Sequence, residues 1–253
     1  QQKRLVDILT DANIYYPMIR DILEKEGLPQ ELVYMAMAES SFNNRAYSKA
    51  RAVGMWQFMP ATAKIFGLKV DNYIDERRDP IKSTYAAAKY LKALHKRFGK
   101  WYLAMMAYNC GEGRVARAIK KAKSDEISKL LKVSRYKRRQ YLPKETRNYI
   151  RKILVLASIA ESDRIHSINN SSHLLNQGVS YPMATVEVGP GTTLNEVADS
   201  MDMSVKELKK LNVSLRYNFV PPYVKTFNIH IPYNKLAQFK QEFKPSKNGK
   251  KFI

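Results

Sequence analysis

The sequence predicts a mainly α-helical protein that closes with a small unit of two strands and two helices. Apolar side chains recur at helical spacing through the first two thirds of the chain, where prolines and glycines mark the starts and ends of helices. Two short segments nearer the C-terminal end alternate apolar and polar residues instead, as strands do. The 253 residues are enough for one large domain or two smaller ones.

The first part of the chain divides into many short helices. A proline just inside the start or a glycine just past the end sets most of their limits. In chain order, we expect helices over 3–26 with a second start at Pro17, from Pro29 to about Glu39, from Pro60 to Gly67, from Asp79 to about Phe98, over 101–109, over 114–123, after Ser124, and from Pro143 to about Ser162. The segments 40–58 and 71–78 lack periodicity and carry polar, turn-forming residues, so we expect loops there.

The last third of the chain has the pattern of a separate β-α-α-β unit. Strand patterns at 185–188 and 226–231 flank two helices, one capped by Thr192 or Thr193 and one by Ser204. The polar stretch 167–173 before this unit is typical of a linker. We therefore divide the chain into a helical domain over 1–165, a linker over 166–180, a small module over 181–234 and a basic tail over 235–253, which we expect to begin as a helix.

The charge balance of the chain is strongly basic. Lysine and arginine number 44 against 23 aspartates and glutamates, which gives a net charge of +21 and a pI near 9.9. Such a chain is expected to meet an anionic partner: a nucleic acid, a membrane surface or an acidic polymer. The basic tract 135–141 and the lysines of the tail could contact nucleic acid, but solvated helix faces explain them more simply.

The sequence favours neither a metal, a cofactor nor a membrane span. The single cysteine, Cys110, excludes a disulfide framework and a cysteine metal site. The four histidines lack ligand spacing, so we expect surface or capping positions for them. No run of about 18 apolar residues occurs. The start at Gln-Gln-Lys-Arg suggests a processed or trimmed N-terminus, which leaves export open.

Glu39 is the first candidate for chemistry. Three apolar residues share its predicted helix face, at positions seven, four and three before it: Leu32, Met35 and Ala36. Desolvation on such a face disfavours the charged form and raises the pKa of a carboxyl, which suits a proton donor near neutral pH. A lone glutamate near a helix end is more often structural, so its surroundings must decide.

Polar and aromatic residues in three segments supply those surroundings. The candidates are Ser48 and Gln57 in the loop after Glu39, Tyr108 and Asn109 at the end of a helix, and Glu145 and Tyr149 at i and i+4 on one helix face. We expect the loop to place Ser48 and Gln57 over the acid. Taken singly, each segment also has a structural explanation as a helix cap or a solvated helix start. Aromatic rings stack on sugar rings and amides pair with hydroxyl and N-acetyl groups, so the set favours a sugar polymer as substrate.

A second catalytic carboxylate is not evident. Ordinary glycosidases use two carboxylates, one as acid and one as nucleophile or base. Asp79, Glu112 and Glu145 are candidates, but the loop 40–58 holds no acid. A single glutamate can protonate the leaving oxygen and then act as base towards a hydroxyl of the same sugar, which closes an internal ring without water.

Several motifs resemble the catalytic domain of the soluble lytic transglycosylase family. They are Glu-Ser-Ser-Phe at 39–42, Ser48, Gly-Met-Trp-Gln-Phe-Met-Pro-Ala-Thr at 54–62, Asp-Glu-Arg-Arg-Asp-Pro at 75–80, Ala-Tyr-Asn at 107–109 and Glu-Thr-Arg-Asn-Tyr at 145–149. They occur in family order over about residues 20–160 and are most similar to the branch of membrane-bound lytic murein transglycosylase D. Residues 185–232 resemble a lysin motif, through Gly-Thr-Thr-Leu at 191–194, Leu-Asn at 211–212 and Ile-His-Ile-Pro at 229–232.

The resemblance implies a lysozyme-like, goose-type α-helical domain. Such a domain cleaves the β-1,4 bond between N-acetylmuramic acid and N-acetylglucosamine in peptidoglycan and leaves 1,6-anhydromuramoyl ends. Glu39 matches the family's sole acid/base, and the muramoyl N-acetyl group is thought to assist in place of a second carboxylate. The positions that match groups around the bound sugars are Ser48, Gln57, Met59, Tyr108 with Asn109 beside it, Glu145 and Tyr149.

The resemblance also sets expectations about partners and location. It implies peptidoglycan glycan strands as partner, no metal or other cofactor, no nucleic acid, and a monomer in the bacterial periplasm, with peripheral or lipid-anchored association with the outer membrane as an option. Two positions depart from the family pattern: Arg51 stands where a glycine is usual and Cys110 where an alanine is usual. A hydrolytic muramidase on the same fold and a noncatalytic wall-binding protein stay open as alternatives. For the module, a spacer or packing role is an alternative to sugar binding.

Overall fold

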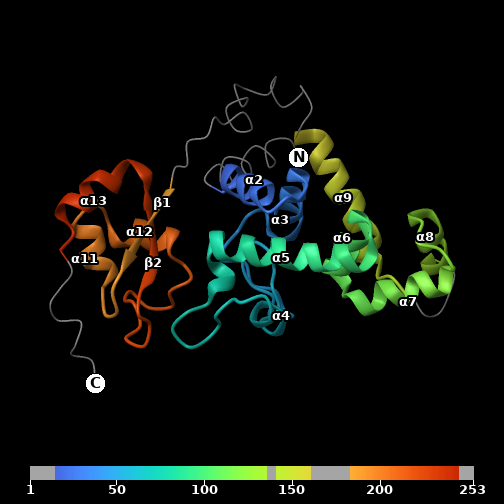
Figure 1. The fold of residues 1–253 in the computed structure, drawn as a ribbon, viewed down its shortest axis with the longest axis horizontal. Helices are drawn as coiled ribbons and strands as arrows, with labels where there is room; N and C mark the ends of the chain where they lie inside the picture. The colour runs from blue at the N-terminus through green and yellow to red at the C-terminus, as the bar shows by residue number, and fades with distance from the viewer. Residues whose placement is uncertain (1–14, 136–140, 161–182, 245–253) are drawn as a thin grey trace.

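A computed structural model describes residues 15–135, 141–160 and 183–244 of the chain. Within them, a helical domain lies beside a smaller module that contains the two strands (Figure 1). The predicted fold class, mainly α with a β-α-α-β unit, is confirmed. The predicted helix before Tyr15, the linker 166–180 and the end of the basic tail lie outside the described residues.

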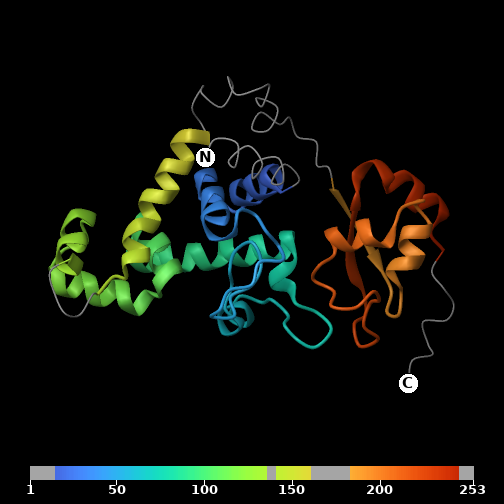
Figure 2. The ribbon, with the colours of Figure 1, turned by 180° about the vertical axis from the view of Figure 1, so that it is seen from behind.

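The helical domain consists of short helices around one core. Its elements are α2 (Tyr16–Lys25), η1 (Gln30–Leu32), α3 (Val33–Ser40), α4 (Pro60–Ile65), η2 (Glu76–Arg78), α5 (Pro80–Phe98), α6 (Trp101–Cys110), α7 (Glu112–Ala122), α8 (Ile127–Arg135) and α9 (Lys144–Ala160). Helix α5 packs on α2 and α6, and α3 packs on α9. Figure 2 shows the same arrangement from behind, with α5 along the middle of the domain.

The limits of these helices follow from their sequence. Asp79 caps α5, because its Oδ1 accepts hydrogen bonds from the backbone N–H groups of Ile81 and Lys82 at 3.0 and 2.8 Å. Helix α6 ends at Cys110, because the next residue, Gly111, has a φ of 88°, a conformation that glycine adopts without strain. The predicted start of α7 at Arg114 is wrong, because the helix begins at Glu112 and only Gly111 leaves the helical region. The end of α4 and the limits of the two strands differ from the predicted ones by one or two residues.

The module packs two helices on a two-stranded antiparallel sheet. Strand β1 (Met183–Val188) pairs with β2 (Phe227–Pro232), with Met183 opposite Pro232 and Val188 opposite Phe227. Helices α11 (Leu194–Asp199) and α12 (Val205–Leu211) each begin with a capping box, Thr193 with Glu196 and Ser204 with Glu207. These reciprocal side-chain and backbone hydrogen bonds explain how two such short helices hold their place.

Helix α13 (Leu236–Glu242) follows the module after the 3-10 turn η4 (Tyr233–Lys235). Its Phe239 is buried in the module's core and stacks on Phe243 with ring centroids 4.6 Å apart. We therefore propose that the module extends beyond the predicted boundary at 234 and includes α13. The division of the remaining chain into domain and linker stays a prediction.

The loop 71–75 of the helical domain joins the module. Ile74 is buried within the module's core rather than its own domain's. The backbone of Asp75 donates to Ser214 O and that of Arg216 to Tyr73 O, both at 2.8 Å. These backbone hydrogen bonds link the helical domain to the module, so the module is docked on the helical domain.

A buried polar contact completes this junction. His230 Nε2 lies 3.0 Å from Asp79 Oδ2, and both side chains are almost fully buried. The sequence predicted surface or capping positions for the histidines, and for His230 this is wrong. The cause is that Thr185 Oγ1 at 3.1 Å and the Asp79 carboxylate satisfy its ring nitrogens inside the protein.

We expect Asp79→Asn to destabilise the folded protein by about 3 kcal/mol at neutral pH, because it breaks a buried pair. His230 lowers the pKa of Asp79 below its ordinary value of 3.8, against the opposing effect of burial. A lowered carboxyl pKa contributes stability above the unfolded pKa and loses it as the pH falls through the folded value. The difference between wild type and variant should therefore shrink below about pH 4.

Urea unfolding at several pH values measures this difference. Asp125→Asn is the matched control, because it removes the same charge from an exposed pair with Lys100 and should change stability little. A variant at Asp79 that unfolds like the control at neutral pH would contradict the expected role of the buried contact.

Candidate active site

Glu39 lies at the C-terminal end of α3, a helix whose residues from Val33 to Ala38 are all buried. The side chain of Glu39 is partly buried. Burial raises the pKa of its carboxyl above the ordinary value of 4.5. The partial negative charge at a helix C-terminus acts in the same direction. The carboxyl is thus placed to hold a proton at a pH where a solvated glutamate has lost it.

Three residues of α9 surround this carboxyl. The Tyr149 hydroxyl and the Lys152 ammonium lower the pKa of Glu39, in that order, while the nearby charge of Glu145 raises it. Lys152 Nζ also donates to the backbone oxygen of Ala38, next to the acid. Burial remains the largest effect, so the pKa of Glu39 is raised overall.

The Tyr149 hydroxyl faces Glu39 from a buried position. Burial raises the pKa of Tyr149 well above its ordinary value, and the charge of Glu39 raises it further. The hydroxyl has no hydrogen-bond partner of standard geometry among the described residues. It lies near enough for a hydrogen bond to Glu39 to affect both pKa values, so a small movement would close that bond.

Tyr108 approaches from α6. Its hydroxyl donates to Trp56 O at 2.8 Å, and its ring lies against Phe58 and Tyr90 with centroids 6.0 and 5.1 Å away. Burial first and the charge of Glu39 second raise the pKa of Tyr108 well above its ordinary value. Tyr108 therefore remains a neutral donor that ties the loop after α3 to the side of the acid.

The loop 40–58 folds into a compact hairpin. Isolated antiparallel bridges pair Tyr47 with Val53 and Val53 with Phe58. Ser48 Oγ accepts from the Ala52 N–H at 3.0 Å, and Gln57 Nε2 donates to Gly54 O at 2.8 Å. Both polar side chains thus stabilise the turns of the loop itself.

The side chain of Arg77 holds this hairpin in place. Its buried guanidinium forms two 2.8 Å hydrogen bonds with Asp75 and donates to Arg51 O at 3.1 Å and Phe58 O at 3.2 Å. Arg51 itself adopts a φ of 68°. The backbone at this position, where the family usually has glycine, therefore adopts the left-handed conformation, which is strained for an arginine.

The structure unites part of the predicted set. Glu39, Tyr108, Glu145 and Tyr149 act on one another electrostatically. For the other predicted residues, the structure shows these features: Ser48 and Gln57 form hydrogen bonds with loop backbone, Asn109 Oδ1 accepts from Thr146 Oγ1 at 2.6 Å, and Met59 is 43% exposed. Their role as substrate-binding residues stays a prediction.

Sequence reasoning missed Lys152 as a member of this group. It follows Glu145 and Tyr149 at i+7 and i+3, which places all three on one face of α9. That spacing was the available signal. A cation at this position limits how far the pKa of Glu39 rises.

Chemically, the group offers one proton-holding carboxyl among neutral hydroxyls. Among the other predicted acids, Asp79 is paired with His230, Glu112 with Arg97, and Glu145 is exposed on α9. Within the described ranges, no three His, Cys, Asp or Glu side chains cluster as metal ligands would. The arrangement suits transfer of a proton to and from a substrate oxygen at Glu39.

In a comparison with known protein families, each of the two parts of the chain matches one family. Residues 17–131 match the Transglycosylase SLT domain family. This part of the chain belongs to that family. Residues 182–247 match the LysM-like domain of lytic transglycosylase MltD. The family resemblance predicted from the motifs is thereby confirmed for both parts.

Individual curated proteins are similar to this chain. Membrane-bound lytic murein transglycosylase D of Escherichia coli K12 is 34% identical over 217 residues, which covers 84% of this chain and 45% of that protein. A protein of Alteromonas sp. named for tributyltin chloride resistance is 50% identical over 114 residues, 45% of this chain and 55% of that protein. The chain thus spans about half the length of these relatives.

Among solved structures, an inactive mutant of the lytic transglycosylase Slt from Pseudomonas aeruginosa is similar with a TM-score of 0.46. It is 24% identical and the match covers 62% of this chain and 25% of that one.

Proposed function

We propose that the chain is a peptidoglycan lytic transglycosylase. It cleaves the β-1,4 bond between N-acetylmuramic acid and N-acetylglucosamine and leaves a 1,6-anhydromuramoyl end. The observation that carries the proposal is the partly buried Glu39 carboxyl with its raised pKa, in an SLT domain whose loop 40–58 has no second acid.

The steps use Glu39 twice. Its protonated carboxyl donates the proton to the leaving glycosidic oxygen as the bond to the muramoyl carbon breaks. The resulting carboxylate then accepts the proton of the muramoyl 6-hydroxyl, whose oxygen attacks the same carbon and closes the anhydro ring. The proton count balances without water. Tyr149 and Lys152 stabilise the carboxylate between the two steps, because both favour its charged form.

A hydrolytic muramidase is the second candidate, and one observation favours it. Glu145 lies close enough for its charge to raise the pKa of Glu39, so a second carboxylate is present near the acid. A base at Glu145 would direct a water instead of the sugar's own hydroxyl. In a transglycosylase, the fragments that Glu145→Gln still releases should carry anhydro ends, whereas a hydrolase would lose its water-activating group.

The test is digestion of purified peptidoglycan sacculi with the full chain. We expect soluble fragments whose new ends are one water lighter than reducing ends. No release of fragments at all would favour the noncatalytic wall-binding protein instead. Salt-dependent DNA binding without release would favour a nucleic-acid partner.

We expect Tyr149→Phe to move the alkaline limb of the pH–rate profile to higher pH. The hydroxyl lowers the pKa of Glu39, so its removal raises that pKa, and the acid then stays protonated at higher pH. Activity measured on sacculi across the pH range checks the shift. Tyr102→Phe is the control, because it removes a hydroxyl that donates to Asp125 O and is not among the groups that shift the pKa of Glu39. A limb that moves to lower pH, or moves equally in both variants, would contradict this role of Tyr149.

The setting of the protein is also a proposal. We infer an anionic cell wall as the partner of the basic surface, in the bacterial periplasm, with peripheral or lipid-anchored association with a membrane. The support is the charge of +21 and relatives that are named membrane-bound. No helix within the described ranges is both long and apolar enough to cross a membrane.

A further inference from the structure

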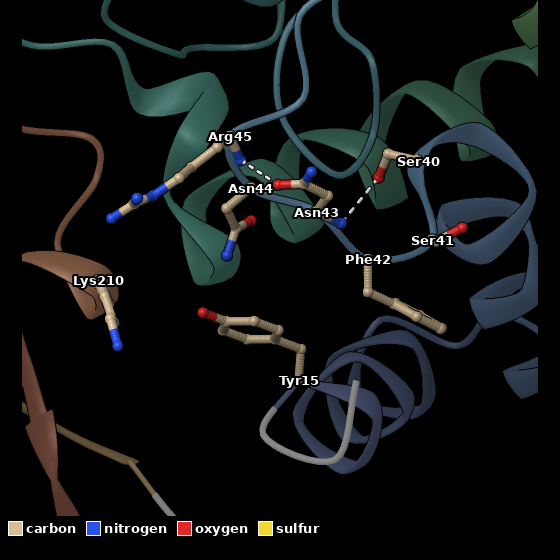
Figure 3. A pocket seen from close by; sticks show the side chains of 8 residues that line it. All are labelled: Tyr15, Ser40, Ser41, Phe42, Asn43, Asn44, Arg45 and Lys210. Atoms are coloured by element: carbon tan, nitrogen blue, oxygen red, sulfur yellow. Dashed lines mark hydrogen bonds between the residues drawn. The ribbon is translucent and has the colours of Figure 1, made fainter. Parts of the chain in front are cut away.

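A pocket of about 390 Å³ lies between the helical domain and the module. Tyr15, the loop residues 40–45 and Lys210 of α12 line it (Figure 3). Its volume is within the range of small-ligand sites. The proposed acid/base chemistry does not use it, although its wall begins at Ser40, one residue after Glu39.

The Asn44 side chain carries the argument for a ligand. It is only 5% exposed, and it lies close enough to the Tyr15 hydroxyl for a hydrogen bond between them to act on the pKa of Tyr15, although neither Nδ2 nor Oδ1 has a partner of standard geometry among the described residues. Figure 3 shows its amide directed from the loop toward the hydroxyl of Tyr15. Buried amides are almost always well paired. The Asn44 amide and the Tyr15 hydroxyl form only a loose pair, so both can turn to a molecule that enters the pocket.

The charge around the pocket is positive. Arg45 and Lys210 are exposed, and neither forms a salt bridge among the described residues, although the charge of Lys210 acts on the exposed Glu207 carboxyl. Burial and, second, the charge of Arg45 lower the pKa of Lys209 to about 8. Arg45 and Lys209 therefore repel each other beside the pocket. An anion bound between Arg45 and Lys210 would relieve this repulsion.

The remaining groups suit an anion as well. Burial raises the pKa of Tyr15, so its hydroxyl stays protonated and can donate. The carboxylate that acts on Tyr15, Asp79, is already held by His230 and by the start of α5. The Asp79 carboxylate is therefore already paired and cannot bind a cation in the pocket, whereas Tyr15, Arg45 and Lys210 can donate hydrogen bonds to an anion.

We propose that this pocket binds a carboxylate of an acidic peptide, namely the peptide that substitutes the muramoyl sugar of peptidoglycan. Charge-assisted hydrogen bonds from Arg45 and Lys210 would hold the carboxylate, with Tyr15 and Asn44 as neutral donors. Ser40, the residue after Glu39, belongs to the wall of the pocket, so the pocket lies beside the end of α3 that carries the acid. Because Lys210 comes from α12, the docked module completes the site. This inference rests on the proposed function for the identity of the peptide.

Calorimetric titration of the full chain tests the proposal. The probes are the free acidic peptide released from peptidoglycan, the same peptide with its carboxylates converted to carboxamides, and inorganic phosphate. We expect the acidic peptide to bind about tenfold more tightly than the carboxamide form. Lys210→Met should remove most of this preference, whereas Lys225→Met, which deletes the same charge from an exposed loop of the module, should bind as wild type does.

Asn44→Leu provides a second variant. It replaces a buried amide whose pairing with Tyr15 is loose, so its melting temperature should stay close to that of wild type while its affinity for the acidic peptide falls. Equal affinity for the two peptides, equal effects of Lys210→Met and Lys225→Met, or phosphate binding as tight as the peptide would each overturn the assignment. The titration needs no cleavage, so its failure is distinct from a failure to release anhydro ends from sacculi.

Discussion

Glu39→Gln is expected to lower the rate of glycan cleavage by roughly a thousandfold, because general acid–base catalysis contributes about 10²- to 10⁴-fold and one residue supplies both steps here. The amide keeps the shape of the carboxyl but can neither release nor accept the proton. Release of muropeptides from sacculi measures the loss. Glu31→Gln is the matched control, since Glu31 is exposed on η1, and should cleave as wild type does.

Stability separates a chemical from a structural role of Glu39. Its pKa is raised in the folded state, so its stabilising contribution exists only at low pH and is lost as the pH rises through the folded pKa. At neutral pH, Glu39→Gln should therefore unfold at the same temperature as wild type or a higher one. An unfolding temperature well below that of wild type would mean that the glutamate is a structural residue.

Gly54→Ala is expected to destabilise the protein by about 3 kcal/mol or more, because strain and overpacking act together there. Gly54 has a φ of 81°, and a Cβ atom on it would lie 1.8 Å from the backbone oxygen of Arg77. The oxygen cannot easily move, because the Arg77 side chain is held by Asp75 and by the oxygens of Arg51 and Phe58. Cleavage should fall too, since the same loop carries Gln57.

Gly27→Ala isolates the backbone part of this effect. Gly27 has a φ of 68°, but a Cβ atom there would meet nothing within 4 Å. It should therefore be destabilised only by the left-handed conformation, about 1 kcal/mol. Chemical denaturation of both variants gives the two values. Equal losses at the two positions would mean that the contact between Gly54 and Arg77 has no energetic weight.

Local signals made most of the helices predictable. The Asp79-Pro80 start of α5 and the serine and threonine caps of the module are written in adjacent residues, and the structure places the helices where these signals lie. The stripe that buries Glu39 was visible for the same reason, because helical spacing alone determines it. The start of α7 could not be decided from sequence, because either Gly111 or Gly113 could have interrupted the helix.

Contacts between distant segments could not be predicted in this way. The polar loop 71–78 gave no sign that Ile74 would enter the module's core or that Asp79 would meet His230. Nor did the sequence show that Ser48 and Gln57 would form hydrogen bonds with the backbone of their own loop; their place over the acid stays a prediction. Polar side chains choose among several partners of similar energy, and only the folded backbone decides which is in reach.

Digestion of sacculi in water enriched in heavy oxygen tests the central claim most directly. If Glu39 activates a hydroxyl of the same sugar as the nucleophile, no solvent oxygen enters the product. We predict that mass spectrometry will find unlabelled 1,6-anhydromuramoyl ends. New reducing ends that carry the heavy oxygen would contradict the single-acid mechanism and identify the protein as a hydrolase.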